Sequence, residues 1–141
     1  MKIYLSTNYR NLNPVREALE MISGRLNIEL YQADYFNIEE QIVPQIIETI
    51  KKSDVVVADI SNENPNIYYE VGIAHSLGKP VILVSQTNNF NRFSLLSYRF
   101  YNYDTDEKGI KNLSFRLEQI LSDNNELNQL KIFLNPRIDQ W

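Results

Sequence analysis

The most telling property of this 141-residue sequence is what it lacks, because it contains no cysteine and only one histidine, His75. Without cysteine there can be no disulfide, thiolate nucleophile, iron–sulfur cluster or cysteine-based zinc site. A single imidazole also excludes a multi-histidine metal site, and a Ser-His-Asp triad would depend on His75 alone. Carboxylates, hydroxyls, amides and helix termini remain for chemistry, so we expect any catalysis here to use a carboxylate.

Glycine is scarce as well, with four residues, and none lies in the segment STNYRNLN after the first predicted strand. The sequence has neither GxGxxG after a strand nor GxxxxGK[ST], which excludes the common dinucleotide-binding and P-loop sites. The glycine-free segment also argues against a flavin-phosphate loop. A phosphorylation receiver domain would need acidic residues after the first strand and a lysine after the fifth, but those places hold Ser6-Thr7 and Asp104.

Positive charge and long apolar runs are missing too. The formal net charge is −4 and the pI about 5.0, whereas a protein that binds a nucleic-acid polymer needs a basic face. No run approaches the roughly 18 apolar residues of a membrane-spanning helix. The first residues, MKIYLSTNYR, show no apolar core followed by a small-residue cleavage site, so we expect a cytoplasmic protein without membrane or nucleic-acid partners.

The spacing of apolar residues predicts alternating strands and helices. Residues 54–58 and 81–85 are mostly apolar without alternation, which is typical of strands buried on both faces. Asn13-Pro14 is a helix start, with Gly24 as the predicted stop of that helix, while Pro44 begins or kinks the next one. The predicted strands are 2–6, 27–31, 54–58, 81–85 and 98–103, and the predicted helices begin near residues 14, 42, 65 and 107.

This order predicts an α/β fold, a flavodoxin-like or Rossmann-like three-layer sandwich with a five-stranded, mainly parallel sheet of order 2-1-3-4-5. We expect 54–58 and 81–85 to be central strands and 98–103 an edge strand. The α/β domain spans residues 1–121. Residues 122–141 form a C-terminal helix or tail, whose apolar side chains need cover from their own domain or from a second subunit.

Ligands of open parallel sheets bind beyond the carboxyl ends of the strands, where the strand order reverses. Here that switch point lies between the first and third strands, so we expect the site between the loops at 6–13 and 59–66. The second loop runs into a helix start, where backbone amides favour an anion. Turn formation and helix capping are the alternative explanation for its polar residues. The polar candidates are Asp59, Ser61, Asn62, Asn64 and Asn66.

Glu70 is the most informative single residue. It follows Ile67 by three positions and precedes Ala74 by four, so it lies on the apolar face of the predicted helix. A carboxylate on a buried face is costly unless it is paired or lines a cavity, so we expect Glu70 to face the switch point. Tyr4, on the first strand, could contact it, although core packing is the favoured role for Tyr4. Gly72, on the same helix, is expected to allow close packing on the sheet.

Residues 53–84, SDVVVADISNENPNIYYEVGIAHSLGKPVILV, resemble the nucleoside 2-deoxyribosyltransferase-like superfamily. This superfamily includes deoxyribosyltransferases, deoxynucleoside 5′-monophosphate N-glycosidases and bacterial TIR-like proteins. The shared pattern is a buried strand ending in an acid, a polar loop, Tyr-Glu-Leu-Gly in a helix, and a lysine before the next strand. This sequence supplies Asp59, Tyr69-Glu70-Val71-Gly72 and Lys79-Pro80-Val81.

The resemblance implies that Glu70 is the catalytic carboxylate, which attacks the anomeric carbon or stabilises the cationic sugar as the base departs. It places substrate contacts on Ser6, Thr7, Asp59 and Asn64. We expect Asp59 to be catalytic together with Glu70, and we add Tyr4 and Asn66 to the residues expected to bind substrate. Two positions depart from the family pattern. Ile46 replaces an acid of the second helix, and Asn8-Tyr9-Arg10 replaces a glycine-rich phosphate loop.

The sequence therefore predicts an N-glycosidase or N-glycosyl transferase that acts on a nucleoside, nucleotide or related ribosyl compound. It would need no metal and no organic cofactor. The alternative is a non-catalytic, TIR-like nucleotide-binding module in bacterial defence or sensing. We also predict a homodimer or higher homo-oligomer, because the tail is apolar and deoxyribosyltransferase-like enzymes associate.

Overall fold

The computed structural model describes residues 1–8, 13–33, 42–62, 64–87 and 99–132. Arg10 and the tail beyond residue 132 lie outside these residues. The described elements are β1 (Lys2–Ser6), α1 (Pro14–Leu26), β2 (Glu29–Tyr31), α2 (Ile42–Lys52), β3 (Val55–Asp59), α3 (Pro65–Ser76), β4 (Val81–Gln86), β5 (Phe100–Tyr103), α4 (Glu107–Leu121) and α5 (Asn124–Gln129). Among the described helices, none is long and apolar enough to cross a membrane.

The five strands form one sheet in the order β2-β1-β3-β4-β5, and every neighbouring pair is parallel. This confirms the predicted strand order. The sheet was predicted to be mainly parallel, and it is parallel at every strand pair. β3 and β4 lie inside the sheet, as their apolar runs predict, and β5 is an edge strand. Because all strands run the same way, their carboxyl ends share one edge.

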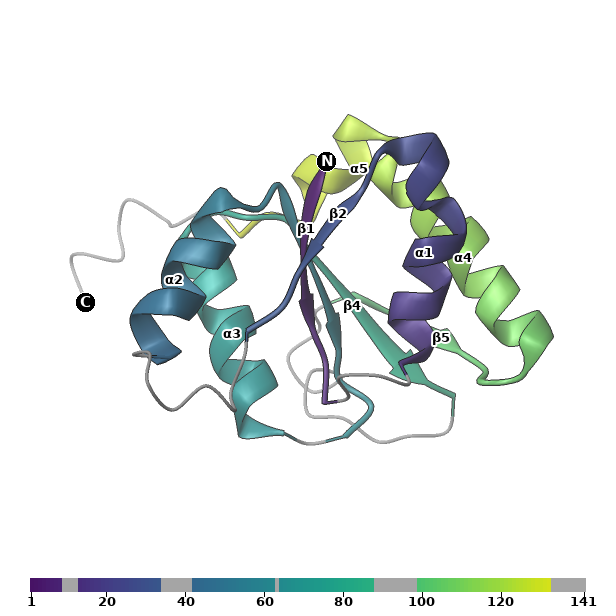
Figure 1. The fold of residues 1–141 in the computed structure, drawn as a ribbon, viewed down its shortest axis with the longest axis horizontal. Coiled ribbons are helices and arrows are strands. Elements are labelled where there is room, and N and C mark those ends of the chain that lie inside the picture. The colour runs from purple at the N-terminus through teal and green to yellow at the C-terminus, as the bar shows by residue number, and fades with distance from the viewer. Residues whose placement is uncertain (9–12, 34–41, 63, 88–98, 133–141) are drawn as a thin grey trace.

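Two helical layers cover the sheet (Figure 1). α1 and α4 pack side by side on one face, and α2 and α3 cover the other. Each face has its own apolar core, and successive residues of a strand alternate between them. Val55 and Val57 of β3 belong to the α1–α4 core, while Val56 and Ala58 belong to the α2–α3 core. This alternation decides which polar side chains meet at the carboxyl edge.

The predicted ends of α1 are correct at one terminus and wrong at the other. Asn13 caps the start, because its Oδ1 accepts hydrogen bonds from the amides of Val15 and Arg16. The helix passes through Gly24 and ends at Leu26, where Asn27 adopts the left-handed conformation with φ 51°. Asparagine tolerates this conformation and takes the role that the sequence assigned to glycine.

Two glycines differ in how much space surrounds them. Gly72 is exposed on α3, and a Cβ built there meets nothing within 4 Å, so the prediction that it permits close packing on the sheet is wrong. Gly109, in the first turn of α4, has the opposite environment. A Cβ there would lie 2.1 Å from the carbonyl oxygen of Asp104, so only glycine allows the backbone at Asp104 to approach α4 this closely.

We expect Gly109→Ala to lower the free energy of unfolding by about 1–3 kcal/mol, because the clash involves backbone and forces α4 to shift. Gly72→Ala is the matched control on an open helix surface. It should raise the free energy of unfolding by about 0.5–1 kcal/mol, through the lower helix cost of alanine. Urea denaturation of both variants checks this, and equal effects would contradict the assignment of the two positions.

Candidate functional site

Glu70 is buried beneath the carboxyl edge of the sheet. It lies in the second turn of α3, and only 3% of its surface is exposed. The helix turns the predicted face inward, and its buried residues are Ile67, Glu70, Val71 and Ala74. The sequence pattern therefore located this side chain on the correct face of the helix.

Both carboxylate oxygens of Glu70 accept hydrogen bonds from side chains of β1. The Tyr4 hydroxyl donates to Oε1 at 2.7 Å, and the Ser6 hydroxyl donates to Oε2. Tyr4 and Ser6 are 0% and 1% exposed. They are two residues apart on a strand, so they project from the same face, the one that α3 covers.

These two donors explain how a carboxylate can sit in an apolar layer. An isolated charge in such a place would carry a large desolvation cost, whereas hydrogen bonds to a charged acceptor are among the strongest in proteins. The arrangement fixes the carboxylate against β1, close to the point where the strand order reverses between β1 and β3. The structure thus brings together Tyr4, Ser6 and Glu70.

Asp59 lies on the other face of the sheet. It continues the series of Val55 and Val57, which belongs to the α1–α4 core, so its side chain is directed away from the face that carries Glu70. Its Oδ2 accepts a hydrogen bond from the Tyr103 hydroxyl at 2.6 Å. Its Oδ1 accepts from the amide and hydroxyl of Ser61, at 2.9 and 2.5 Å.

The Asp59 contacts link three strands at their carboxyl ends. Ser61 follows β3 and also accepts a hydrogen bond from the backbone amide of Gln86 on β4, at 2.8 Å. Tyr103 is the last residue of β5. The sequence analysis assigned no role to Tyr103. The available signal was its position at the end of the predicted edge strand, because the carboxyl ends of parallel strands lie at one edge of the sheet. Asp59 therefore holds the start of the loop between β3 and α3.

Asn64 joins the two loops that flank the switch point. Its Oδ1 accepts from the amide of Asn66 at 2.8 Å and caps α3, while its Nδ2 donates to Oδ1 of Asn8, in the segment after β1. Asn66 lies exposed in the first turn of α3. Helix capping was the alternative explanation for the polar residues of this loop, and Asn64 does cap α3. The same side chain also makes the contact between the two loops.

Thr7 belongs to a second polar group, at the carboxyl ends of β1 and β2. Its hydroxyl oxygen accepts hydrogen bonds from the side-chain amides of Asn13 and of Gln32, the latter at 3.2 Å. Gln32 in turn accepts from the guanidinium of Arg16 at 3.0 Å. The sequence gave no sign of Gln32 or Arg16, because their pairing depends on how α1 packs beside β2.

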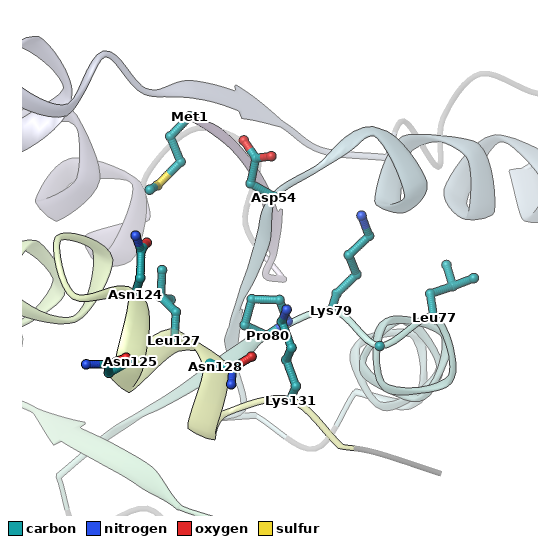
Figure 2. A pocket seen from close by; sticks show the side chains of 11 residues that line it. Met1, Asp54, Leu77, Lys79, Pro80, Asn124, Asn125, Leu127, Asn128 and Lys131 are labelled. Carbon is teal, nitrogen blue, oxygen red and sulfur yellow. The ribbon is translucent and has the colours of Figure 1, made fainter.

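The described residues also enclose a hollow of about 670 Å³ far from these groups, at the amino-terminal edge of the sheet (Figure 2). Two of its charged side chains hydrogen-bond to the backbone. Asp54 accepts from the amide of Lys2 at 2.7 Å, and Lys79 donates to the carbonyl of Lys51 at 3.0 Å. In parallel sheets ligands bind at the opposite edge, so we place the site at Glu70 and not in this hollow.

Metal-binding geometry does not occur within the described ranges, where no three histidine or acidic side chains cluster as ligands would. His75 lies half-buried on α3, five residues after Glu70, and burial lowers its pKa. The neutral imidazole is therefore favoured at pH 7. Among the described residues, the polar groups at the carboxyl edge are carboxylates, hydroxyls, amides and the guanidinium of Arg16.

Comparison with known proteins gives one family and several structures. The model of the family described as nucleoside 2-deoxyribosyltransferase matches residues 7–126. Among curated proteins, none matches this sequence.

Solved structures share the fold at low sequence identity. A CMP N-glycosidase of Clostridium botulinum, BcmB, superposes with a TM-score of 0.60 and 17% identity, covering 84% of this chain and 99% of the other. A 2-deoxyribosyltransferase of Bacillus psychrosaccharolyticus gives a TM-score of 0.59 and 20% identity, covering 95% and 100%. A conserved protein of Enterococcus faecalis gives 0.54 and 15%, covering 82% and 98%.

Tyr103 makes folding sensitive to high pH. Burial, and then the negative charge of Asp59, raise the pKa of its hydroxyl well above the ordinary value of 10.0. A raised folded-state pKa means that this stability is complete below about pH 10 and is lost as the pH rises further. We expect the free energy of unfolding to fall as the pH rises above about 10, the unfolded value, and to fall less in Tyr103→Phe. Denaturant titrations of both proteins across this range check the difference, and parallel curves would contradict it.

Proposed function

The chain belongs to the nucleoside 2-deoxyribosyltransferase family, whose enzymes act on nucleosides or nucleotides, and we propose that it cleaves the base–sugar bond with Glu70 as the reacting carboxylate. The observation that carries the proposal is the buried Glu70 side chain, held by Tyr4 and Ser6 at the switch point of the sheet. The fold shared with a CMP N-glycosidase and a 2-deoxyribosyltransferase supports it.

The proposed reaction follows from the charge that develops in it. As the bond between the anomeric carbon and the base nitrogen breaks, its electron pair leaves with the base and the sugar becomes cationic. A fixed carboxylate in a poorly hydrated site stabilises that cation strongly. Glu70 then forms a glycosyl ester, which water or a second base cleaves. Hydrolysis and glycosyl transfer differ only in this acceptor.

We propose different roles for the polar residues around Glu70. Tyr4 positions the carboxylate through Oε1. Asn64, Asn66 and Thr7 remain our candidates for substrate contacts, since they lie on the loops and helix start beside the switch point. Asp59 is reassigned from catalysis to positioning, because its hydrogen bonds to Ser61 and Tyr103 hold the loop on the opposite face.

We expect Glu70→Gln to lower base release by at least about 100-fold, because the amide is isosteric but neither nucleophilic nor charged. The assay follows free base by liquid chromatography over a panel that includes CMP and 2′-deoxynucleosides. Nucleotide binding should persist in the variant when measured by calorimetry.

Glu118→Gln is the matched control, because it removes a carboxylate that pairs with Arg25 on the surface of α4. It should leave base release unchanged. If the unaltered protein binds nucleotides without releasing base, the proposed reaction is wrong and the binding-module alternative is favoured. Equal loss in both variants would also count against a specific role of Glu70.

We further propose that the chain associates with itself. Phe115 on α4 is 64% exposed, and Met21 on the neighbouring helix α1 is also exposed, which leaves apolar surface on the α1–α4 layer. Covering such surface contributes favourably to association. Measuring the mass of the protein in solution tests this association without any substrate.

Light scattering at micromolar concentration should give about twice the 16.6 kDa chain mass. Phe115→Lys should shift the protein toward the monomer, since a charge cannot be buried there without a partner. A shortened protein that ends at Ser122 shows how much the tail contributes to association. If the full chain, Phe115→Lys and the shortened protein are all monomers, the proposal is contradicted.

A further inference from the structure

A second hollow lies on the face of the sheet opposite Glu70. It has a volume of about 250 Å³ and runs between the edge strand β5 and the helix α4, which lie side by side (Figure 1). β5 contributes Tyr101 and Tyr103, whose side chains pack in the α1–α4 core. Pockets for drug-sized ligands measure about 300–1,000 Å³, so this one suits a smaller compound.

The polar side chains that line this hollow are not used by the protein itself. Within the part of the chain that the structure describes, the side chains of Asn102, Asn112 and Arg116 make no hydrogen bond or ion pair with other residues. The larger hollow at the amino-terminal edge differs, because Asp54 and Lys79 there hydrogen-bond to the backbone. The smaller hollow therefore offers several unpaired N–H donors, which suits a ligand rich in acceptor oxygens.

Arg116 is held by a ring and not by a carboxylate. Its guanidinium carbon lies 4.8 Å from the centre of the Tyr101 ring, which is a cation–π contact. Arg25, by contrast, pairs with Glu118 at 2.7 Å. Because the ring contact does not occupy the N–H groups, Arg116 keeps the planar set of donors that binds a carboxylate or phosphate through two hydrogen bonds.

The Tyr101 hydroxyl is a second observation that points to a ligand. Its oxygen is buried, and it has no hydrogen-bond partner among the described residues. A buried hydroxyl without a partner lowers stability, so native structures usually supply one from the protein, a water or a ligand. The side chain that lies over this ring is Arg116, which is exposed and therefore able to turn without repacking the core.

From these observations we propose that the hollow between β5 and α4 is a binding site for a small oxyanion, either a phosphate monoester or a carboxylate. Arg116 turns from the ring and pairs with the anionic group. This movement uncovers the Tyr101 hydroxyl, which donates to another oxygen of the ligand. The carboxamides of Asn102 and Asn112 contact the uncharged part of the ligand.

The charges around the hollow allow this assignment. Its lining includes one acid, Asp104, which lies against Gly109 in the first turn of α4. Asp104 is three residues further along the chain than Tyr101, or about 10 Å in extended backbone, so its charge acts at the other end of the hollow. The site lies on the face opposite Glu70 and does not depend on the proposed function.

Titration with inorganic phosphate and with acetate, at constant ionic strength, tests the site and distinguishes the two kinds of oxyanion. Nuclear magnetic resonance spectra show where each anion binds, and we expect the backbone amide signals of Asn102 and Asn112 to shift until the site is saturated. Arg116→Gln should raise Kd by at least about tenfold, the size of a lost hydrogen bond to a charged group.

Tyr101→Phe keeps the ring beneath Arg116 and removes only the hydroxyl. It should raise Kd by about 3- to 10-fold, and it should raise the melting temperature of the ligand-free protein, because an unpaired buried hydroxyl is lost. A hydroxyl with a purely structural role would give a lower melting temperature and an unchanged Kd, and that result would overturn the proposal.

Lys131→Gln is the matched control, because it removes an equal charge from the lining of the larger hollow. It should leave Kd unchanged. Equal weakening in Lys131→Gln and Arg116→Gln would show attraction to net charge alone, and signal shifts confined to other parts of the chain would show that the anion binds elsewhere. Either result would overturn the proposal. Because these experiments measure anion binding and not base release, a failure of the proposed function leaves their outcome unaffected.

Discussion

Burial of one carboxyl group determines how the α2–α3 face of this sheet is built. Glu70 lies in an apolar layer, and its polar side chain is accommodated there because β1 supplies hydroxyl donors at two alternate positions. β1 must therefore be a central strand next to β3, and α3 must cross it in one register. A shift of α3 by one residue would turn Glu70 away from both donors, so fold and site depend on the same contact.

The alternation of side chains along parallel strands explains why two acids at one edge have different roles. Glu70 reaches the sheet from the α2–α3 layer, while Asp59 projects into the α1–α4 layer and binds Tyr103. Two acids 11 positions apart in the sequence thus belong to two separate hydrogen-bond groups. One group holds the Glu70 carboxylate against β1, and the other holds the backbone that leads to α3.

The sequence predicted what depends on local pattern. Unbroken apolar runs identified the central strands, helical spacing placed Glu70 on the buried face, and the segment around Tyr69-Glu70 identified the family, which the match over residues 7–126 confirms. One contact between distant segments, that of Tyr4 with Glu70, was among the possibilities that the sequence raised. Others were beyond it. Asp59 and Glu70 lie on opposite faces of the sheet because of strand alternation, and Thr7 pairs with Gln32 because of how the helices and strands pack in three dimensions.

The bridge between Asn8 and Asn64 has a consequence for the timing of the proposed reaction. It joins the segment after β1 to the start of α3, while Glu70 itself is 3% exposed. If Glu70 reacts as proposed, the side chains that cover this carboxylate must move before a substrate reaches it, and the exclusion of water afterwards favours the reaction. The bridge restrains that movement, whose rate would then set an upper limit on turnover. The time for which the site stays closed would also decide whether the glycosyl ester meets water or a second base first.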